Sequence, residues 1–179
     1  MEYSEKTISS KEIFKGNIVN VEQLTVELPN GKKTTRDMIK HPGASVIIPI
    51  TDRNEIYMVK QFRKAIESES LELPAGKLDP GESPYDCAKR ELKEETGLDA
   101  EKIKHLISVY TTPGFCNEVL HIFEATGLVE GNACTDPDEF LNCEKYKISE
   151  LVQMIYNHEI KDSKTIIGIF MAERQLNKR

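Results

Sequence analysis

Apolar and polar residues alternate along residues 16–40, and the alternation is interrupted at Asn30-Gly31. A period of two places successive side chains on opposite faces of a strand, and Asn-Gly is the strongest short-range signal for a tight hairpin turn. We therefore expect an antiparallel β hairpin over residues 16–40. An isolated hairpin is only marginally stable in water, so it needs a surface to lie against, and a partner subunit is one candidate.

Two further segments, residues 44–51 and 55–62, are rich in β-branched and aromatic residues and are separated by Asp52-Arg53-Asn54. Turn-forming residues between two such runs predict a second hairpin. Residues 71–78 also look extended up to their glycine, and we expect further strands at residues 104–112 and 121–128.

Helical periodicity appears in three places, at residues 83–96, 149–160 and 162–176. In the last two, apolar residues recur at i, i+3 and i+4, with Ser149 as a candidate N-cap of the first and Asp162 or Ser163 as candidates for the second. Strands that bracket single helices favour an α+β fold with a mixed sheet over a doubly wound fold.

The composition is that of an ordinary globular protein, with 39% hydrophobic and 30% charged residues in 179. This length suits one principal domain with a modest extension. No apolar run is long enough to cross a bilayer, so we expect no membrane partner and a cytoplasmic location. The net charge of −6 argues against nucleic acid as a partner, and the four cysteines have no metal-ligand spacing.

The helix expected at residues 83–96 is unusual in how its charges are distributed. At 100° per residue, Tyr85, Leu92 and Thr96 form the buried stripe, and Glu91 and Glu95 border it. Partial burial raises the cost of unpaired anions. The acids Glu91, Glu94 and Glu95 lie on one flank of the stripe and the bases Lys89, Arg90 and Lys93 on the other.

A bound cation is one explanation for this crowding, and an ordinary solvated helix with mixed charges is the other. Carboxylate oxygens without His or Cys nearby are hard ligands that suit Mg²⁺ or Mn²⁺. Before the helix, Gly76 and Gly81 let the backbone turn and approach a ligand closely, and Pro84 suits a first helical turn. Gly97 is placed to cap the other end.

The spacing of these residues forms a longer pattern. Gly76 is followed after five residues by Glu82 and after seven more by Arg90-Glu91-Leu92, then by Glu94-Glu95 and Gly97-Leu98. The pattern resembles the Nudix box of the Nudix hydrolase family, GX5EX7REUXEEXGU with U an aliphatic residue, at all nine defined positions. The resemblance implies an α/β/α sandwich over residues 42–179, preceded by an N-terminal β-hairpin region at residues 1–41 that serves in dimerisation.

The resemblance also assigns roles within the box. Glu91 and Glu95 would be the principal metal ligands, assisted by Glu94 with Glu82 nearby, and Ala75 would offer its backbone carbonyl to a metal. Arg90 would orient the carboxylates through charge-assisted hydrogen bonds, for which a planar guanidinium is well suited.

Features outside the box resemble the ADP-ribose pyrophosphatase branch of the family. Pro113 lies 113 − 97 = 16 residues after Gly97, as does the proline that marks this branch. The segments VKQFRKA, LELPAGKL, TDPDEF and IKDSKTIIG are also similar to that branch. In those enzymes the N-terminal strands help to build a homodimer with a shared site, which would explain the unsupported hairpin.

The activity implied is hydrolysis of ADP-ribose to AMP and ribose 5-phosphate by attack of an activated water on phosphorus. Two or three Mg²⁺ ions per site, with Mn²⁺ as a substitute, would neutralise the diphosphate and lower the pKa of the water. Glu139 in TDPDEF is our candidate for the general base or a further ligand, with Asp136 and Asp138 as rivals. Contacts to the substrate are expected from Arg36, Arg63, Phe115 and Glu118.

Two other readings stay open. The same chemistry would serve another nucleotide sugar, such as GDP-mannose. A Nudix-fold module that senses ADP-ribose without cleaving it is the alternative from another class. Such modules tend to lose box acids and to carry an effector domain, whereas this chain retains the acids, and we expect no added DNA-binding domain within 179 residues.

Overall fold

A computed structural model describes residues 3–131 and 142–176 of the chain. The chain divides into two compact units. The N-terminal unit comprises residues 1–43 and 109–119, and the second unit comprises residues 44–108 and 120–179. The sequence pattern did not indicate that the segment 109–119 belongs to the N-terminal unit.

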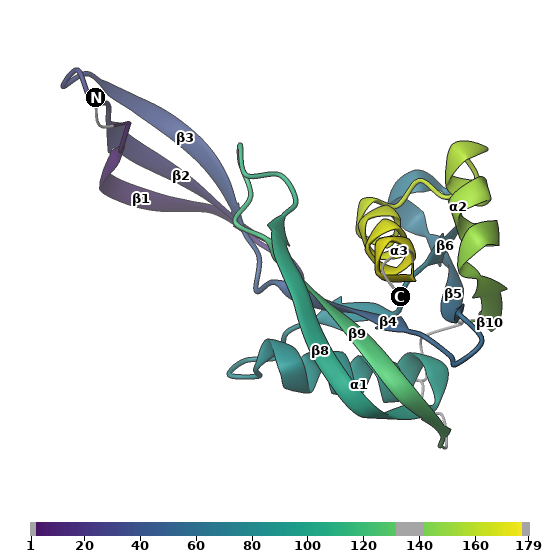
Figure 1. Cartoon of the computed structure of the whole chain (residues 1–179). Helices are drawn as coiled ribbons and strands as arrows, with labels where there is room; N and C mark the ends of the chain where they lie inside the picture. The colour runs from purple at the N-terminus through teal and green to yellow at the C-terminus, as the bar shows by residue number, and fades with distance from the viewer. Residues whose placement is uncertain (1–2, 132–141, 177–179) are drawn as a thin grey trace. The chain divides into compact units, whose positions relative to one another are not determined.

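The N-terminal unit is a three-stranded antiparallel sheet in the order β1-β2-β3 (Figure 1). The expected hairpin is present as β2 (Asn20–Glu27) and β3 (Lys33–Lys40), with Gly31 N donating to Leu28 O at 2.8 Å in the turn. Strand β1 (Lys6–Lys15) extends this hairpin and was not predicted. Each of its ten residues is exposed, so it lacks the buried face that gives a strand its alternating pattern.

Residues 109–119 return to the far side of β3. Ile39 N donates to Phe115 O at 2.7 Å, and Asn117 N donates to Ile39 O at 3.2 Å. Asn117 Oδ1 also accepts from His41 N at 2.8 Å. Two of these bonds join backbone atoms and one uses the Asn117 side chain, and together they attach the segment to β3 and the residue after it. A sequence pattern does not reveal such long-range bonds.

The second unit contains two sheets. The larger has the order β7-β4-β9-β8, in which β4 runs parallel to β9 and antiparallel to β7. The smaller has the order β10-β5-β6 and is antiparallel. The strands are β4 (Ala44–Pro49), β5 (Glu55–Arg63), β6 (Ser68–Glu72), β7 (Ala75–Lys77), β8 (Leu98–Tyr110), β9 (Val119–Glu130) and β10 (Asn142–Lys147), with a 3-10 turn at Lys64–Ile66.

The second hairpin expected from residues 44–51 and 55–62 is wrong. Its turn forms, but the two strands share only the isolated bridge Ile50↔Ile56 among the described residues before they enter different sheets. The reason is burial: every residue of β4 is buried, whereas β5 has exposed positions. A strand that is apolar on both faces belongs in the centre of a covered sheet.

Three helices complete the second unit, as expected: α1 (Pro84–Thr96), α2 (Ile148–Tyr156) and α3 (Ser163–Leu176). Ser149 is not an N-cap, because α2 begins one residue earlier and Lys147 occupies the cap position. Asp162 does cap α3, since its Oδ2 accepts from Thr165 N at 3.0 Å. No helix within the described ranges is both long and apolar enough to span a membrane.

Helices cover both faces of the larger sheet (Figure 1). Ile47 packs in one cluster with Ala88 and Leu92 of α1. Its neighbour Ile48 points the other way, toward α3, where a Cβ added at Gly168 would meet Ile48 Cδ1 at 3.4 Å. Consecutive residues of β4 therefore hold one helix on each face, which confirms the α/β/α sandwich.

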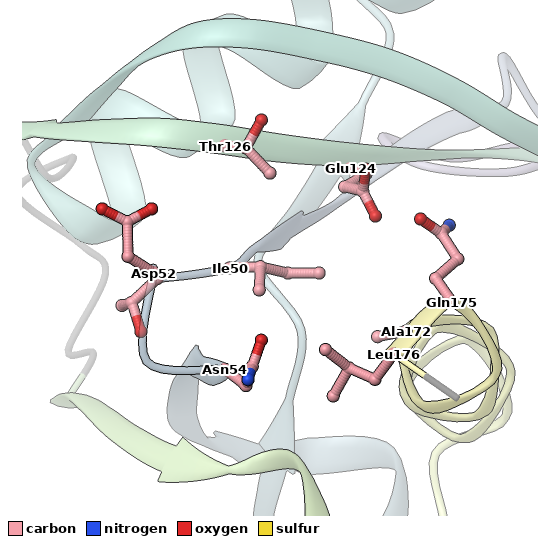
Figure 2. Close-up of a pocket in the computed structure, with 9 residues that line it drawn as sticks. Ile50, Asp52, Asn54, Glu124, Thr126, Ala172, Gln175 and Leu176 are labelled. Carbon is pink, nitrogen blue, oxygen red and sulfur yellow. The ribbon is translucent and has the colours of Figure 1, made fainter. Parts of the chain in front are cut away.

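A cavity of about 200 Å³ lies between the loop after β4, strand β9 and the C-terminal end of α3 (Figure 2). The described residues that line it include two carboxylates, Asp52 and the buried Glu124, and no Lys or Arg. An anion such as a diphosphate would be repelled there, so this cavity is not a candidate for a phosphate site.

Leu92 is fully buried where α1 packs on the sheet. Leu92→Ala should lower the free energy of unfolding by about 2–5 kcal/mol, because it removes buried methyl groups and leaves a cavity. Chemical denaturation measures the change. Lys89→Ala, on the exposed side of the same helix, is the control and should change stability by less than about 0.5 kcal/mol. Equal effects of the two changes would contradict the packing described here.

Candidate metal-binding and catalytic site

The helix that carries the acids is fixed at both ends. Ser83 caps α1, with its Oγ accepting from Asp86 N at 3.1 Å, and Pro84 follows in the first turn as expected. At the other end Gly97 adopts φ 71° and donates from its N to Lys93 O at 2.9 Å. This left-handed conformation favours glycine, so the predicted cap is confirmed.

Gly76 allows a close approach between β7 and α1. A Cβ added there would lie 1.8 Å from Glu91 Oε1, a distance that no pair of nonbonded atoms tolerates. We expected the glycine to make room for a ligand. In the structure, the group closest to where a Gly76 side chain would begin is instead the carboxylate of Glu91. That carboxylate occupies the space that a side chain at position 76 would fill.

The buried stripe of α1 is narrower than expected. Leu92 is buried and Thr96 is half-buried, but Tyr85 is 48% exposed, so its placement in the stripe is wrong. Tyr85 lies in the first turn of the helix, where its ring and that of Phe123 are in an edge-to-face arrangement at a centroid distance of 6.4 Å. The acids behave as expected, since Glu91 and Glu95 are 8% and 5% exposed.

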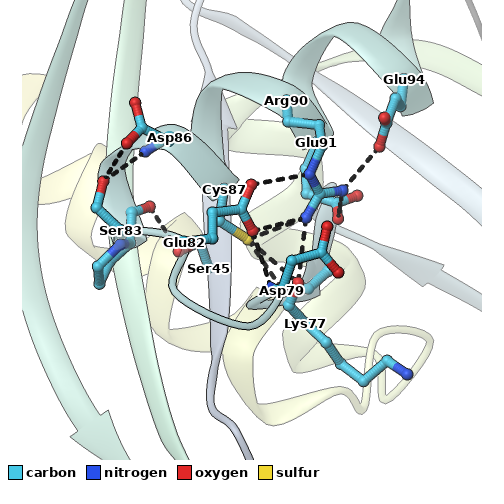
Figure 3. Close-up of polar contacts among 12 residues, drawn as sticks. Ser45, Lys77, Asp79, Glu82, Ser83, Asp86, Cys87, Arg90, Glu91 and Glu94 are labelled. Carbon is cyan, nitrogen blue, oxygen red and sulfur yellow. Dashed lines mark hydrogen bonds and ion pairs between the residues drawn. The ribbon is translucent and has the colours of Figure 1, made fainter.

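Arg90 lies at the centre of the acidic cluster (Figure 3). Its Nε and Nη2 donate to the two oxygens of Glu82 at 2.9 and 3.0 Å. Its Nη1 donates to Glu91 Oε1 at 2.5 Å and to Glu94 Oε2 at 2.8 Å. The helical angle alone placed Arg90 among the bases on the far flank, but its long side chain turns back and connects three carboxylates.

These contacts determine the electrostatics of the site. Hydrogen bonds from Arg90 lower the pKa of Glu82 to about 2, and the same bonds to Glu82 raise the pKa of Arg90. Burial raises the pKa of the neighbouring Cys87 thiol to about 11, so that it stays neutral. With the four acids ionised, the cluster of Glu82, Glu91, Glu94, Glu95 and Arg90 has a formal charge of −4 + 1 = −3.

Ala75 lies beside Glu95. Its backbone N donates to Glu95 Oε2 at 2.9 Å, while the preceding Pro74 O accepts from Ile47 N at 2.9 Å. The backbone of Ala75 is thus held between the central strand and a buried acid. Cys143, on β10, also lies within the influence of Glu95, because burial and the charge of Glu95 raise the pKa of its thiol to about 11.

The donor chemistry of the cluster fits a hard divalent cation. The described residues contain no group of three His, Cys, Asp or Glu side chains in a metal-binding arrangement. Arg90 binds one or two oxygens of each of Glu82, Glu91 and Glu94. A cation here would complete its shell with water or substrate oxygens, as Mg²⁺ commonly does.

The residues expected to contact substrate fall in different units. Arg63 is in the second unit, where its guanidinium bonds to Glu72. Arg36 and Phe115 both line a cavity of about 500 Å³ within the N-terminal unit, with Arg36 paired to Glu5 at 2.7 Å. Glu118, in the same unit, accepts from Thr111 Oγ1 at 2.9 Å and lies 3.4 Å from His41 Nδ1. Asp136, Asp138 and Glu139 lie outside the described residues.

Sequence reasoning missed a second charged cluster, formed by Arg63, Glu72, Asp162 and Lys164. Its members are up to 101 residues apart, since 164 − 63 = 101. The sequence pattern indicated the segments that carry them, as strands, as a helix and through their resemblance to a family branch, but it did not bring their charged residues together. An acid next to apolar residues, Glu72 in the segment LELPAG, is the signal that marks such a partner in a sequence.

Comparison with known proteins extends these observations to nearly the whole chain. The NUDIX domain matches residues 39–167, and the nucleoside diphosphate sugar hydrolase N-terminal domain matches residues 5–37. A protein named methanol dehydrogenase activator from Bacillus methanolicus is 44% identical over 97% of this chain and 95% of its own. The ADP-ribose pyrophosphatases of Bacillus subtilis and Mycobacterium tuberculosis are 41% and 36% identical, over 92% and 94% of this chain and 90% and 83% of theirs.

A solved structure described as an ADP compounds hydrolase has the same fold. The TM-score is 0.85 at 22% identity, covering 97% of this chain and 95% of that one. The sandwich, the acidic helix with its central arginine, and the family match over residues 39–167 lead to one conclusion. The chain belongs to the Nudix family of hydrolases.

Proposed function

We propose that this Nudix hydrolase cleaves the diphosphate of ADP-ribose to give AMP and ribose 5-phosphate. The observation that carries the proposal is the acidic cluster around Arg90, a site of formal charge −3 on a chain whose relatives include two ADP-ribose pyrophosphatases. A diphosphate is itself an anion, so it approaches such a site only with cations between them.

Divalent metal is a general requirement of Nudix hydrolases, and we propose Mg²⁺ as the ion, two or three per site, with Mn²⁺ as a substitute. When bound, these ions neutralise the diphosphate and lower the pKa of the attacking water. We assign Glu91 and Glu95 as the principal ligands, because both are buried acids next to the strand that contains Ala75. Glu94, Glu82 and the carbonyl of Ala75 complete the set.

Arg90 has the role of orienting these acids. It holds Glu82 through two hydrogen bonds and reaches Glu91 and Glu94 with the third nitrogen. A planar guanidinium fixes several carboxylates at once and offsets part of their mutual repulsion. The acids are therefore arranged before any ion binds.

We assign the proton-accepting role to Glu139, with Asp136 and Asp138 as rivals. The described residues that flank this segment lie near the acidic helix. Gly131 N donates to Gly97 O at 2.8 Å, at the end of the acidic helix. Cys143, four residues after Glu139, is close enough to Glu95 for the charge to raise its pKa.

Arg63, Arg36, Phe115 and Glu118 are our candidates for contacts to the substrate. The cavity in the N-terminal unit combines the guanidinium of Arg36 with the exposed ring of Phe115, a pair that suits a nucleobase or a phosphate. Arg63 offers a guanidinium in the unit that holds the box acids.

We further propose a cytoplasmic homodimer in which residues 1–41 form the dimerisation element. Apolar side chains on the outer strand β1 support this, since Ile8, Ile13 and Phe14 are 44%, 52% and 56% exposed. Exposed apolar groups gathered on one strand mark an interaction surface more often than a solvated one.

Removing the charge of one principal ligand tests the metal assignment. Glu95→Gln should lower kcat by at least about a hundredfold, because a neutral amide is a poor ligand for a hard dication. Steady-state kinetics in Mg²⁺ measures the change, and circular dichroism checks the fold. Glu130→Gln, at the exposed end of β9, is the matched control and should retain activity. A Glu95→Gln enzyme with full activity would refute the assignment.

Product analysis tests the substrate. Incubated with ADP-ribose and Mg²⁺, the protein should release AMP and ribose 5-phosphate, and EDTA should abolish the release. In a panel with GDP-mannose and other nucleotide sugars, ADP-ribose should give the highest kcat/KM. A higher value for GDP-mannose would move the assignment to that substrate. Tight binding of ADP-ribose without release of AMP would instead indicate a sensing module.

Sedimentation equilibrium tests the dimer. The chain has a mass of 20.3 kDa, so the expected species at micromolar concentration has 2 × 20.3 = 40.6 kDa. Phe14→Glu should shift it toward the monomer, because a charge on the apolar strand opposes its burial. A wild-type protein that sediments as a single 20.3 kDa species would exclude the dimer.

A further inference from the structure

The second charged cluster, formed by Arg63, Glu72, Asp162 and Lys164, joins the end of β5, the end of β6 and the start of α3. We propose that Glu72 is a positioning residue, which holds the guanidinium of Arg63 in place to bind the diphosphate of the substrate. The inference rests on the proposed function and adds to it a residue that does not itself touch the substrate.

The pair between Arg63 and Glu72 has the geometry of a fixed fork. Arg63 Nε donates to Glu72 Oε1 at 2.9 Å, and Nη2 donates to Oε2 at 2.8 Å. The Glu72 side chain is 4% exposed, whereas that of Arg63 is 43% exposed. One edge of the guanidinium is therefore bound to a buried acid, and Nη1 lies outside this pair of bonds on a side chain that solvent reaches.

Glu72 is ionised in spite of its burial. Burial opposes the charge, but hydrogen bonds from Arg63 and the proximity of Lys164 outweigh it and hold the pKa at about 2. Lys164 Nζ also donates to Asp162 Oδ2 at 2.9 Å. The two cations and two anions of the cluster thus balance, and Glu72 is an ionised acceptor for Arg63 at neutral pH.

One short segment of the chain carries both Glu72 of the second cluster and Ala75 of the candidate metal site. Thr165 is fully buried, and its Oγ1 donates to Asp162 Oδ2 at 2.6 Å and accepts from Leu73 N at 2.9 Å. Leu73 follows Glu72 and lies two residues before Ala75, whose N donates to Glu95. The N-terminus of α3 therefore fixes the piece of chain that runs from Glu72 to the candidate metal site.

Arg63 is tied to that site through the chain, because Glu72, which holds it, lies three residues before Ala75, whose N donates to Glu95 at 2.9 Å. Hydrogen bonds to Glu72 raise the pKa of Arg63, and the charge of Glu95 raises it further. Cations held at Glu95 would bring a diphosphate into the same neighbourhood. A guanidinium already held in place loses less conformational freedom when it binds that diphosphate than a mobile one would.

A double-mutant cycle on kcat/KM tests the proposal. Glu72→Gln and Arg63→Gln should each lower kcat/KM for ADP-ribose by about tenfold to a hundredfold, mainly through KM, the scale of a lost charge-assisted hydrogen bond. The double variant should be no worse than Arg63→Gln alone, because Glu72 acts only through Arg63. A general loss of structure would lower kcat/KM further in the double variant.

Glu69→Gln is the matched control. Glu69 pairs with Lys60 across the same two strands at 2.6 Å, but both side chains are exposed, at 65% and 49%, so this change should leave KM unaltered. If Glu72→Gln does not fold, Glu72→Asp enters the same cycle, since it keeps the charge but shortens the reach to Arg63.

The outcomes separate the two proposals. A wild-type protein that cleaves no nucleotide sugar overturns the proposed function and this inference with it. If the wild-type enzyme cleaves ADP-ribose but the losses in kcat/KM from the Glu72 and Arg63 substitutions multiply in the double variant, only the positioning role is overturned. The positioning role is supported if the losses in kcat/KM do not multiply and if KM changes in the Glu72 and Arg63 variants but not in the Glu69→Gln control.

Discussion

Repulsion among four carboxylates is the constraint around which the candidate site is built. Two of them, Glu91 and Glu95, are buried, where unpaired charge is most costly. The protein offsets part of that cost with one guanidinium, since Arg90 bonds to Glu82, Glu91 and Glu94. The formal excess of three negative charges that remains makes the cluster a candidate site for cations, and a stable structure with this excess requires a rigid support.

That support comes from the centre of the larger sheet. Strand β4 is buried along its whole length and contacts α1 through Ile47 and α3 through Ile48. The same strand accepts β7 as its neighbour and so places Ala75 beside Glu95. Just before β7 in the chain, the backbone N of Leu73 donates to Thr165 Oγ1 of α3. One strand thus connects the core, the acidic helix and the charged cluster at α3.

Local sequence patterns predicted the local parts of this arrangement. The three helices, the cap at Gly97 and the burial of Glu91 and Glu95 follow from periodicity and spacing over a few residues. The long-range parts did not follow. Whether β4 pairs with β5 or with β9 depends on which surface covers it, and Arg63, Glu72 and Lys164 meet only after the sheets form. The contact of the Arg90 side chain with the acids likewise could not be predicted, because it depends on the length of that side chain, whereas a helical angle gives only the direction in which the side chain leaves the helix.

The space at Gly76 gives this site an uncharged point of weakness. Its missing side chain leaves the place that Glu91 occupies, with only 1.8 Å between an added Cβ and the carboxylate oxygen. A methyl group there would collide with the acid while every ionisable residue stayed in the sequence. A side chain at this uncharged position would force the Glu91 carboxylate to move, so the arrangement of the acids depends on the glycine as well as on the acids themselves.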